Sequence, residues 1–93
     1  MAEISLALRA PLAPGDLPGL AQRLCGQIAP GVRRALLDVS LARPDALTVD
    51  ALAQLQLLAK RRGCQVILRG CSPELRDLVA FMGLTHVLPD DSL

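Results

Sequence analysis

Apolar residues along the chain follow two different spacings, and each spacing predicts one kind of element. In residues 4–8 (ISLAL) every second side chain is apolar, which is typical of a strand with one buried face. In residues 17–28 apolar side chains recur every three or four positions, which predicts a helix with Asp16 as its N-cap residue. Two prolines and a glycine in residues 9–15 separate these elements, because such residues cannot continue a strand ladder.

The middle of the chain repeats this order of strand and helix. Residues 35–39 (ALLDV) have no polar face, which favours a central strand that is covered on both sides. After a loop over residues 40–46, the leucine spacing predicts a second helix over about 49–62 that ends at Gly63. The side chains expected to face inward are Leu52, Leu55, Leu58 and Ala59. Residues 65–68 (QVIL) then predict a third strand.

The last part of the chain begins with a clear helix start. Ser72 is followed by Pro73 and Glu74, the pattern of an N-cap residue, a proline in the first turn and an acidic residue near the helix N-terminus. Gly83 is expected to end this helix, and residues 85–88 (THVL) predict a last short strand. The alternation predicts an α/β fold: a small sandwich of about four strands in a mainly parallel sheet, with three or so helices. With 93 residues, the chain is expected to form a single domain over residues 1–93.

Composition narrows the classes of partner. The net charge is +1 and Phe81 is the only Phe, Tyr or Trp, so neither a basic surface nor stacking platforms for nucleic acid are expected. No run of about 18 apolar residues occurs, which predicts no membrane insertion. The first residues also lack the basic region of a secretory signal. These features predict a cytoplasmic protein without a nucleic-acid partner.

Residue types suited to catalysis or metal binding are sparse. Cys25, Cys64 and Cys71 show no CxxC spacing, and His86 is the only histidine, so no zinc site is expected. No Gly-rich phosphate loop occurs, and no two carboxylates are spaced for acid–base chemistry. We therefore expect no catalytic residue, no cofactor and no metal, and we expect the cysteines to be small apolar fillers in a reducing compartment.

Polar residues gather before and at the start of the second predicted helix. In a parallel sheet, binding sites form at the carboxyl ends of the strands, where the helix N-termini also lie. Thr48 and Asp50 fall there, and their simplest role is structural, with Thr48 as N-cap residue and Asp50 as the second helical residue. The same positions also suit a surface that a partner or a kinase recognises, and both roles stay open at this point.

Residues 34–89 resemble the STAS domain, the module of sulfate transporters and of bacterial anti-sigma factor antagonists. ALLDVS (35–40) is similar to the family's strand that ends in Asp-Leu-Ser, and ALAQLQLLAKRRGCQVILRG (51–70) is similar to its helix, glycine and strand. CSPELRDLVAFMGLTHVLP (71–89) is similar to the family's SPE-x-R-x-L-x-x-x-GL helix and last strand. The first third is similar more loosely, and one strand of the family's opening hairpin is missing.

The resemblance implies a position for a phosphorylation motif. Anti-sigma factor antagonists typically carry Asp-Ser-Ser-Gly-Leu or Asp-Thr-Gly-Gly-Leu at the start of the second helix, where the partner kinase phosphorylates a Ser or Thr. The four residues before Leu in this motif fall on Thr48, Val49, Asp50 and Ala51. Asp50 therefore stands at the position of the phosphorylated Ser. The flanking edge loops would contribute Asp16, Ser40 and Ser72.

The resemblance also implies a function. It predicts a non-catalytic bacterial signalling module that regulates transcription by binding an anti-sigma factor kinase, without a phosphorylation switch at Asp50. The family's alternative is a small STAS subunit that docks on the ATPase of a membrane complex, such as a lipid-transport ABC system. A homodimer is compatible with either role. Binding of a small anion is disfavoured, because Asp16, Asp45 and Asp50 bring negative charge to the edge where helix N-termini would hold it.

Overall fold

Strands and helices alternate along the chain in the computed structural model, which describes residues 2–8 and 15–90. The strands are β1 (Ala2–Ala7), β2 (Val32–Asp38) and β3 (Gln65–Arg69), and the helices are α1 (Leu17–Gln27), α2 (Ala46–Arg61) and α3 (Pro73–Phe81). The predicted α/β fold with three helices is therefore confirmed. No helix in the described ranges is long and apolar enough to cross a membrane.

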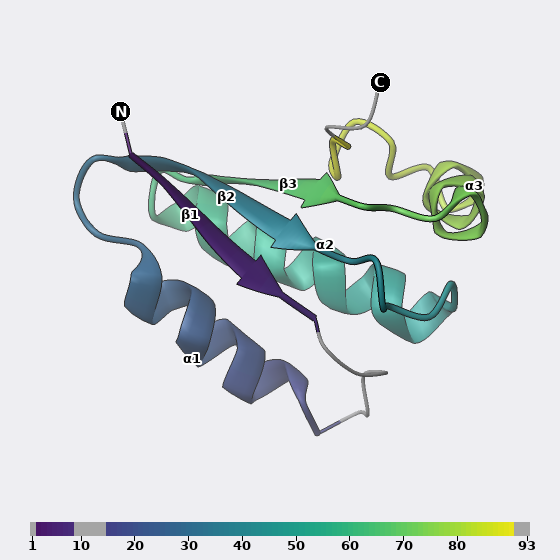
Figure 1. The fold of residues 1–93 in the computed structure, drawn as a ribbon, viewed down its shortest axis with the longest axis horizontal. Coiled ribbons are helices and arrows are strands. Elements are labelled where there is room, and N and C mark those ends of the chain that lie inside the picture. Colours follow the sequence, from purple (N-terminus) through teal and green to yellow (C-terminus); the bar gives the residue numbers. More distant parts are fainter. Residues whose placement is uncertain (1, 9–14, 91–93) are drawn as a thin grey trace.

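The three strands form one parallel sheet in the order β1-β2-β3, so β2 is its central strand. Connections between neighbouring parallel strands are almost always right-handed, and strands added in chain order then place both connecting helices on the same face of the sheet. The packing agrees, because α2 contacts α1, β3 and α3. Figure 1 shows the sheet in front of α2. The described elements thus form two layers, one of strands and one of helices.

The predicted fourth strand is replaced by turns. In residues 85–88, the backbone N–H groups of Val87 and Leu88 donate to the carbonyl oxygen of Leu84, at 3.0 and 2.9 Å. The chain meets the sheet only after this turn, through a single parallel bridge between Leu68 and Asp90. The strand prediction for residues 85–88 is wrong, because local turn bonds already satisfy backbone groups that a ladder would have paired. The described sheet accordingly has three strands rather than about four.

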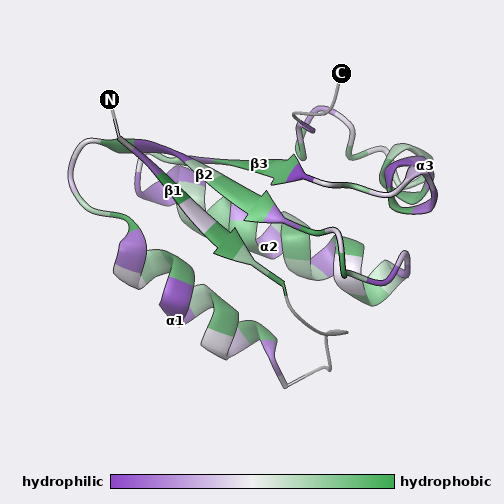
Figure 2. Cartoon of the chain, viewed as in Figure 1, coloured by the Kyte–Doolittle hydropathy of each residue, from purple (hydrophilic) through white to green (hydrophobic). Residues whose placement is uncertain are grey.

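The helix-covered face of the sheet holds most of the core. Leu37 on β2 and Val39, which directly follows this strand, are 2% and 1% exposed and share one cluster with Leu52 and Leu55 of α2, which are fully buried. Figure 2 shows the hydrophobic strands lying over helices that carry hydrophilic residues on only part of their surface. Leu58, which was expected to face inward as well, is half-buried.

The opposite face of the sheet, called the open face below, has no helix or strand of the described chain packed on it (Figure 1). Its side chains form three rows across the strands, set by the strand register: Glu3, Arg34 and Gln65; Ser5, Leu36 and Ile67; Ala7, Asp38 and Arg69. Leu36 and Ile67 are 7% and 9% exposed but stay outside the core cluster. The central position of β2 is confirmed, but its predicted cover on both sides is wrong. Leu36 is therefore buried although no described helix packs on its face.

Gln56 is a buried polar residue on α2 that reaches the outer edge of β3. It is 1% exposed, and its amide nitrogen donates to the carbonyl oxygens of Val66 and Val87, at 2.9 and 2.8 Å. Its amide oxygen accepts from the backbone N–H of Val66 at 2.8 Å. A buried amide is tolerated when its donors and acceptor are paired, as they are here. Gln56 therefore closes the β3 edge, whereas no described strand pairs with the outer edge of β1.

Candidate functional site

Helix α2 begins earlier than the leucine spacing predicts. Asp45 is its N-cap residue, with an extended backbone (φ −128°, ψ 166°) and a carboxylate that accepts a hydrogen bond from the backbone N–H of Thr48 at 2.8 Å. The prediction that Thr48 is the N-cap residue and Asp50 the second helical residue is therefore wrong. Asp and Thr are both good caps, and Asp45 takes the role because Thr48 stands three residues later, where an N-cap side chain reaches the backbone.

Only Asp50 is exposed among the four residues at the predicted phosphorylation motif. Thr48, Val49 and Ala51 are 1%, 0% and 4% exposed. The hydroxyl of Thr48 also hydrogen-bonds to the Asp45 carboxylate. Asp50 faces solvent and accepts a hydrogen bond from Nε2 of Gln54, one turn later, at 2.8 Å. A partner that docks here therefore meets Asp50 and not the other three side chains.

The exposed side of α2 has two leucines that the sequence analysis did not single out. Leu47 and Leu57 are 40% and 54% exposed. With Asp50 and Gln54 they lie at spacings of three and four residues, which places all four on one side of the helix; we call them the α2 ridge. Leu41, in the loop before α2, is 63% exposed. The signal in the sequence was that these leucines fall outside the inward stripe.

The loops after β2 and β3 meet at the carboxyl edge of the sheet. Gly70 has a positive φ of 71°, and a Cβ atom there would lie 3.1 Å from Cβ of Ser40 and 3.3 Å from Oδ1 of Asp38. Glycine is therefore required on both conformational and steric grounds. Ser40 is exposed, and its backbone N–H donates to Oδ1 of Asp38 at 2.9 Å.

The other two flanking residues hold different roles. Ser72 is the N-cap residue of α3, as predicted, and its hydroxyl accepts from the backbone N–H of Leu75 at 3.1 Å. Asp16 occupies the N-cap position of α1, but its side chain makes no capping hydrogen bond. Residues 9–14, which precede Asp16, lie outside the described residues.

Two carboxyl groups at this edge have lowered pKa values. The pKa of Asp45 lies below its usual value because the carboxylate accepts hydrogen bonds from the backbone N–H and then the hydroxyl of Thr48. The pKa of Asp38 is lowered in the same way by the backbone N–H and hydroxyl of Ser40, with a smaller contribution from Arg69. Both groups are therefore anionic at neutral pH and fix the loop and helix start around them.

The cysteines form no disulfide among the described residues. All three are free, with Cys64 and Cys71 buried and Cys25 half-buried. Burial raises the pKa of the Cys64 and Cys71 thiols, so both are protonated and poorly nucleophilic at neutral pH. In residues 2–8 and 15–90, no three His, Cys, Asp or Glu side chains lie close enough to hold a metal ion.

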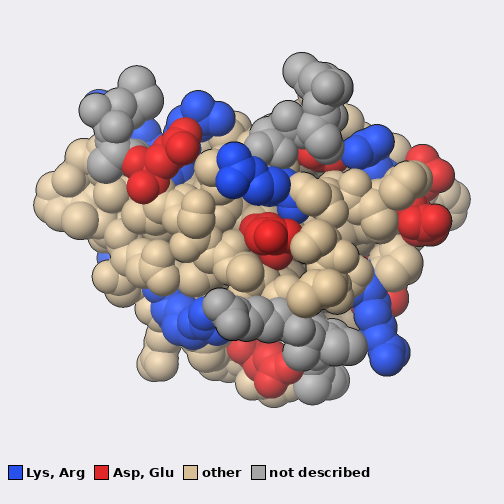
Figure 3. Space-filling model, viewed as in Figure 1, with Lys and Arg blue, Asp and Glu red and all other residues tan. Residues whose placement is uncertain are grey.

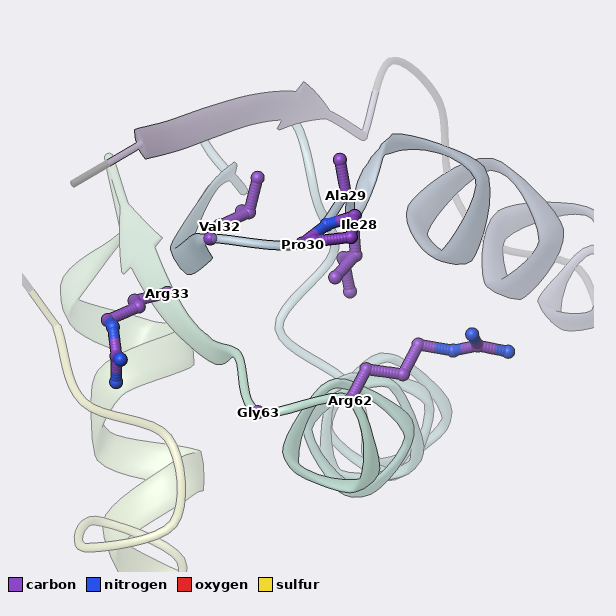
Figure 4. Close-up of a pocket in the computed structure, with 8 residues that line it drawn as sticks. Ile28, Ala29, Pro30, Val32, Arg33, Arg62 and Gly63 are labelled. Carbon is purple, nitrogen blue, oxygen red and sulfur yellow. The ribbon is translucent and has the colours of Figure 1, made fainter.

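A hollow of about 530 Å³ lies at the opposite edge of the sheet, where α1 and α2 end (Figure 4). Pro30 and Gly63 line it together with two arginines, Arg33 and Arg62. In Figure 4 the two arginine side chains point away from each other. Their charges do not converge on a common ligand, so the hollow is a groove between two helix ends rather than an anion site.

Another hollow, of about 570 Å³, lies between β3, α3 and the segment that follows α3. Leu68, Val79 and Leu88 contribute its apolar lining. Nε of Arg76 and Oδ2 of Asp90 form an ion pair at 3.1 Å beside it. These two charges compensate each other, and Asp77 adds a further carboxylate to the lining, so the hollow does not favour an anionic ligand.

Comparison with known proteins establishes the fold. No family model matches the sequence, and no curated protein matches it significantly. The chain is similar in structure to a sulfate transporter family protein from Wolinella succinogenes, with a TM-score of 0.69. The alignment has 23% sequence identity and covers 98% of this chain and 78% of that chain. This likeness agrees with the small STAS-like α/β domain expected from the sequence, and at this identity it concerns the fold alone.

Proposed function

We propose that the chain is a protein–protein interaction module that binds its partner through the α2 ridge. The observation that carries this proposal is the exposure of Leu47 and Leu57 on one side of α2, with the hydrogen-bonded pair Asp50 and Gln54 between them. Exposed leucines at helical spacing supply apolar anchors for a partner, and a polar pair between them supplies orientation.

The STAS resemblance suggests the class of partner, an anti-sigma factor kinase. Asp50 stands where the family carries its phosphorylated Ser, and its carboxylate supplies one permanent negative charge where phosphoserine would supply about −1.5 to −2. Thr48 does not replace that Ser, because its side chain is buried and bonded to Asp45. The module therefore works in one state, without a phosphorylation switch at residues 48–51.

A substitution at Asp50 tests the missing switch. Asp50→Ser restores a hydroxyl at an exposed position of α2. Incubation of this variant with ATP and the cognate kinase is expected to add one phosphate, detected by mass spectrometry, whereas the wild type gains none at residues 48–51. The proposal is contradicted if the wild type is phosphorylated at Thr48, or if an active kinase leaves the variant unmodified.

The STAS resemblance also suggests a second candidate function, because the family includes modules of transport proteins. In this version the chain is a small STAS subunit that docks on the ATPase of a membrane transport complex, of the lipid-transport ABC kind. The same ridge serves both versions, so identification of the partner separates them.

Affinity purification of the tagged chain from its native cell, with mass spectrometry of the bound proteins, tests the proposed function. Leu57→Glu places a charge in the α2 ridge, and Gln22→Glu places the same charge on the exposed surface of α1 as a matched control. The wild type and Gln22→Glu are expected to retain the partner, and Leu57→Glu is expected to lose it at least tenfold. A kinase-type anti-sigma factor identifies the first version, and an ATPase with a permease identifies the second. Equal recovery with Leu57→Glu contradicts the ridge as the binding surface.

A further inference from the structure

We propose that two copies of this chain associate through their open faces as an antiparallel, two-fold symmetric pair in which Arg34 of each copy meets Asp38 of the other. This inference goes beyond the proposed function. It uses the face of the sheet that α1 and α2 leave uncovered, and it does not involve the α2 ridge.

The sheet is of a type that usually has both faces covered. Parallel sheets occur almost only with both faces covered, whereas antiparallel sheets commonly leave one face in water. Here all described strand pairs are parallel, and the described helices pack together on one side. Leu36 and Ile67 form an apolar centre on the other side. A second layer on the open face would complete the usual architecture of such a sheet.

The strand register decides which arrangement of two copies is electrostatically favourable. Arg34 lies two residues before Leu36 on β2, and Asp38 lies two residues after it, so both point to the open face. A two-fold axis that runs perpendicular to the strands, along the row of Leu36, makes the strands of the two copies antiparallel. It places Arg34 of each copy opposite Asp38 of the other. An axis along the strands instead places Arg34 opposite Arg34 and Asp38 opposite Asp38, which is unfavourable.

The neighbouring charges support the first arrangement. Arg34 already pairs with Glu3 of its own copy at 3.3 Å, yet its side chain remains 44% exposed. In the pair, the Arg34 guanidinium would meet two carboxylates, one from Glu3 of its own copy and one from Asp38 of the second copy. The guanidinium of Arg69 of the second copy would lie one strand away. The four charged groups that the strands contribute to each open face sum to zero, and Arg23 of α1 lines the hollow on that face. Figure 3 shows acidic and basic groups lying beside one another in a mostly uncharged surface.

The open face is also hollowed where the second copy would approach. A depression of about 310 Å³ is lined by Ser5, Leu36, Asp38 and Arg69 of the sheet and by Arg23 and Gln27 of α1. The side chain of Arg34 from the second copy is long enough to enter this depression and reach the Asp38 carboxylate. Ile67 then faces Ile67, and Leu36 faces Leu36, so the apolar centres coincide.

The area of the face sets the strength of the association. Three strands about 4.8 Å apart and about 17 Å long cover on the order of 250 Å². A standard interface covers roughly 800 Å² per partner. We therefore expect a weak, concentration-dependent dimer, which is measured by sedimentation equilibrium of the full chain from about 10 μM to about 1 mM.

Two single substitutions test the contact. Arg34→Glu places carboxylates opposite each other, and Asp38→Lys places two cations opposite each other; each is expected to weaken self-association at least tenfold. An equimolar mixture of the two variants is expected to form a heterodimer, because one contact then joins the introduced carboxylate to the introduced ammonium group, and the other keeps Asp38 opposite Arg34. Circular dichroism checks that each variant is folded, and Leu57→Glu, on the α2 ridge, is expected to dimerise like the wild type.

The outcomes separate the alternatives. The proposal is overturned if the wild type stays monomeric up to about 1 mM, or if both single variants dimerise as well as the wild type. A mixture that stays monomeric while the folded wild type dimerises overturns the antiparallel arrangement. Loss of the partner from Leu57→Glu with an intact dimer shows that the partner surface and the open face act separately.

Discussion

Leu36 and Leu37 are neighbours in β2, yet they belong to two different environments. Leu37 is 2% exposed and packs in the core cluster against the helix layer, whereas Leu36 is 7% exposed and lies on the open face outside that cluster. Both side chains are buried by area, but only Leu37 is enclosed by another layer. A low exposed fraction alone therefore does not show that a second layer packs on a residue.

The largest expected effect separates these two faces directly. Leu37→Ala removes buried methyl groups and leaves a cavity between the layers, so it is expected to lower the free energy of unfolding by about 3 kcal/mol. Leu36→Ala is expected to cost about 1 kcal/mol in the monomer, because water fills the space that it leaves. Urea unfolding monitored by circular dichroism at low protein concentration measures both. Equal losses would contradict the view that the open face is uncovered.

Gln56 provides the next test, because it is the buried amide of the covered face. Gln56→Ala leaves the backbone N–H and C=O of Val66 without their partner, and it is expected to cost about 2 kcal/mol. Gln54→Ala, an exposed glutamine one helix turn from Asp50, is the matched control and is expected to cost less than about 0.5 kcal/mol. If both changes have the same effect, the closure of the β3 edge by Gln56 does not stabilise the fold.

The sequence predicts the elements of this fold well but not their layers. Apolar spacing locates all six strands and helices of the described chain, because each element buries one side. It does not show which faces of the sheet are covered by other elements. An uninterrupted apolar run in β2 fits a strand with helices on both faces, and it equally fits a strand on which Leu36 is buried without a second layer. The turn at residues 85–88 was missed because the apolar pattern there predicts a strand. The backbone N–H groups of Val87 and Leu88 instead donate to the carbonyl oxygen of Leu84.

For the candidate site, the sequence does not show which side chains are exposed. The resemblance placed attention on residues 48–51, and the structure leaves Asp50 as the exposed member of that group. Two residues, Asp45 and Thr48, both suit the N-cap, and the choice between them depends on where the chain leaves the sheet edge. The exposed leucines of the α2 ridge were missed, although their spacing places them outside the inward stripe of the helix.

Substitutions at Asp45 test what stabilises the start of α2, in the helix layer. Asp45→Ala removes the cap and is expected to cost about 1 kcal/mol, whereas Asp45→Asn keeps an acceptor for the N–H of Thr48 and is expected to cost much less. Thermal unfolding measures both variants. If Asp45→Ala is neutral while Thr48→Ala costs about 1 kcal/mol, Thr48 and not Asp45 holds the helix start.

Acid unfolding compares how much two carboxylates contribute to stability, one on the open face and one in the helix layer. Asp38 lies on the open face and Asp45 caps the helix layer, and both have pKa values lower in the folded state than the usual value of about 3.9. Their stabilisation is therefore present above about pH 4 and is lost as the pH falls through and below that value. Asp38→Asn and Asp45→Asn are each expected to flatten the loss of stability between about pH 4 and pH 2. An unchanged pH profile in both variants would contradict the hydrogen bonds assigned to these carboxylates.

Asp50 is expected to show the smallest effect on stability and the clearest separation of stability from binding. Asp50 lies in the second turn of α2 and is exposed, and its carboxylate accepts a hydrogen bond from the exposed side chain of Gln54. Asp50→Ala should therefore change the free energy of unfolding by less than about 0.5 kcal/mol. Because the same carboxylate lies between the two leucines of the α2 ridge, partner affinity should fall at least severalfold, measured by titration of the purified partner. Unchanged affinity together with a stability loss near 1 kcal/mol would assign Asp50 to the helix alone and remove the charged group from the proposed interface.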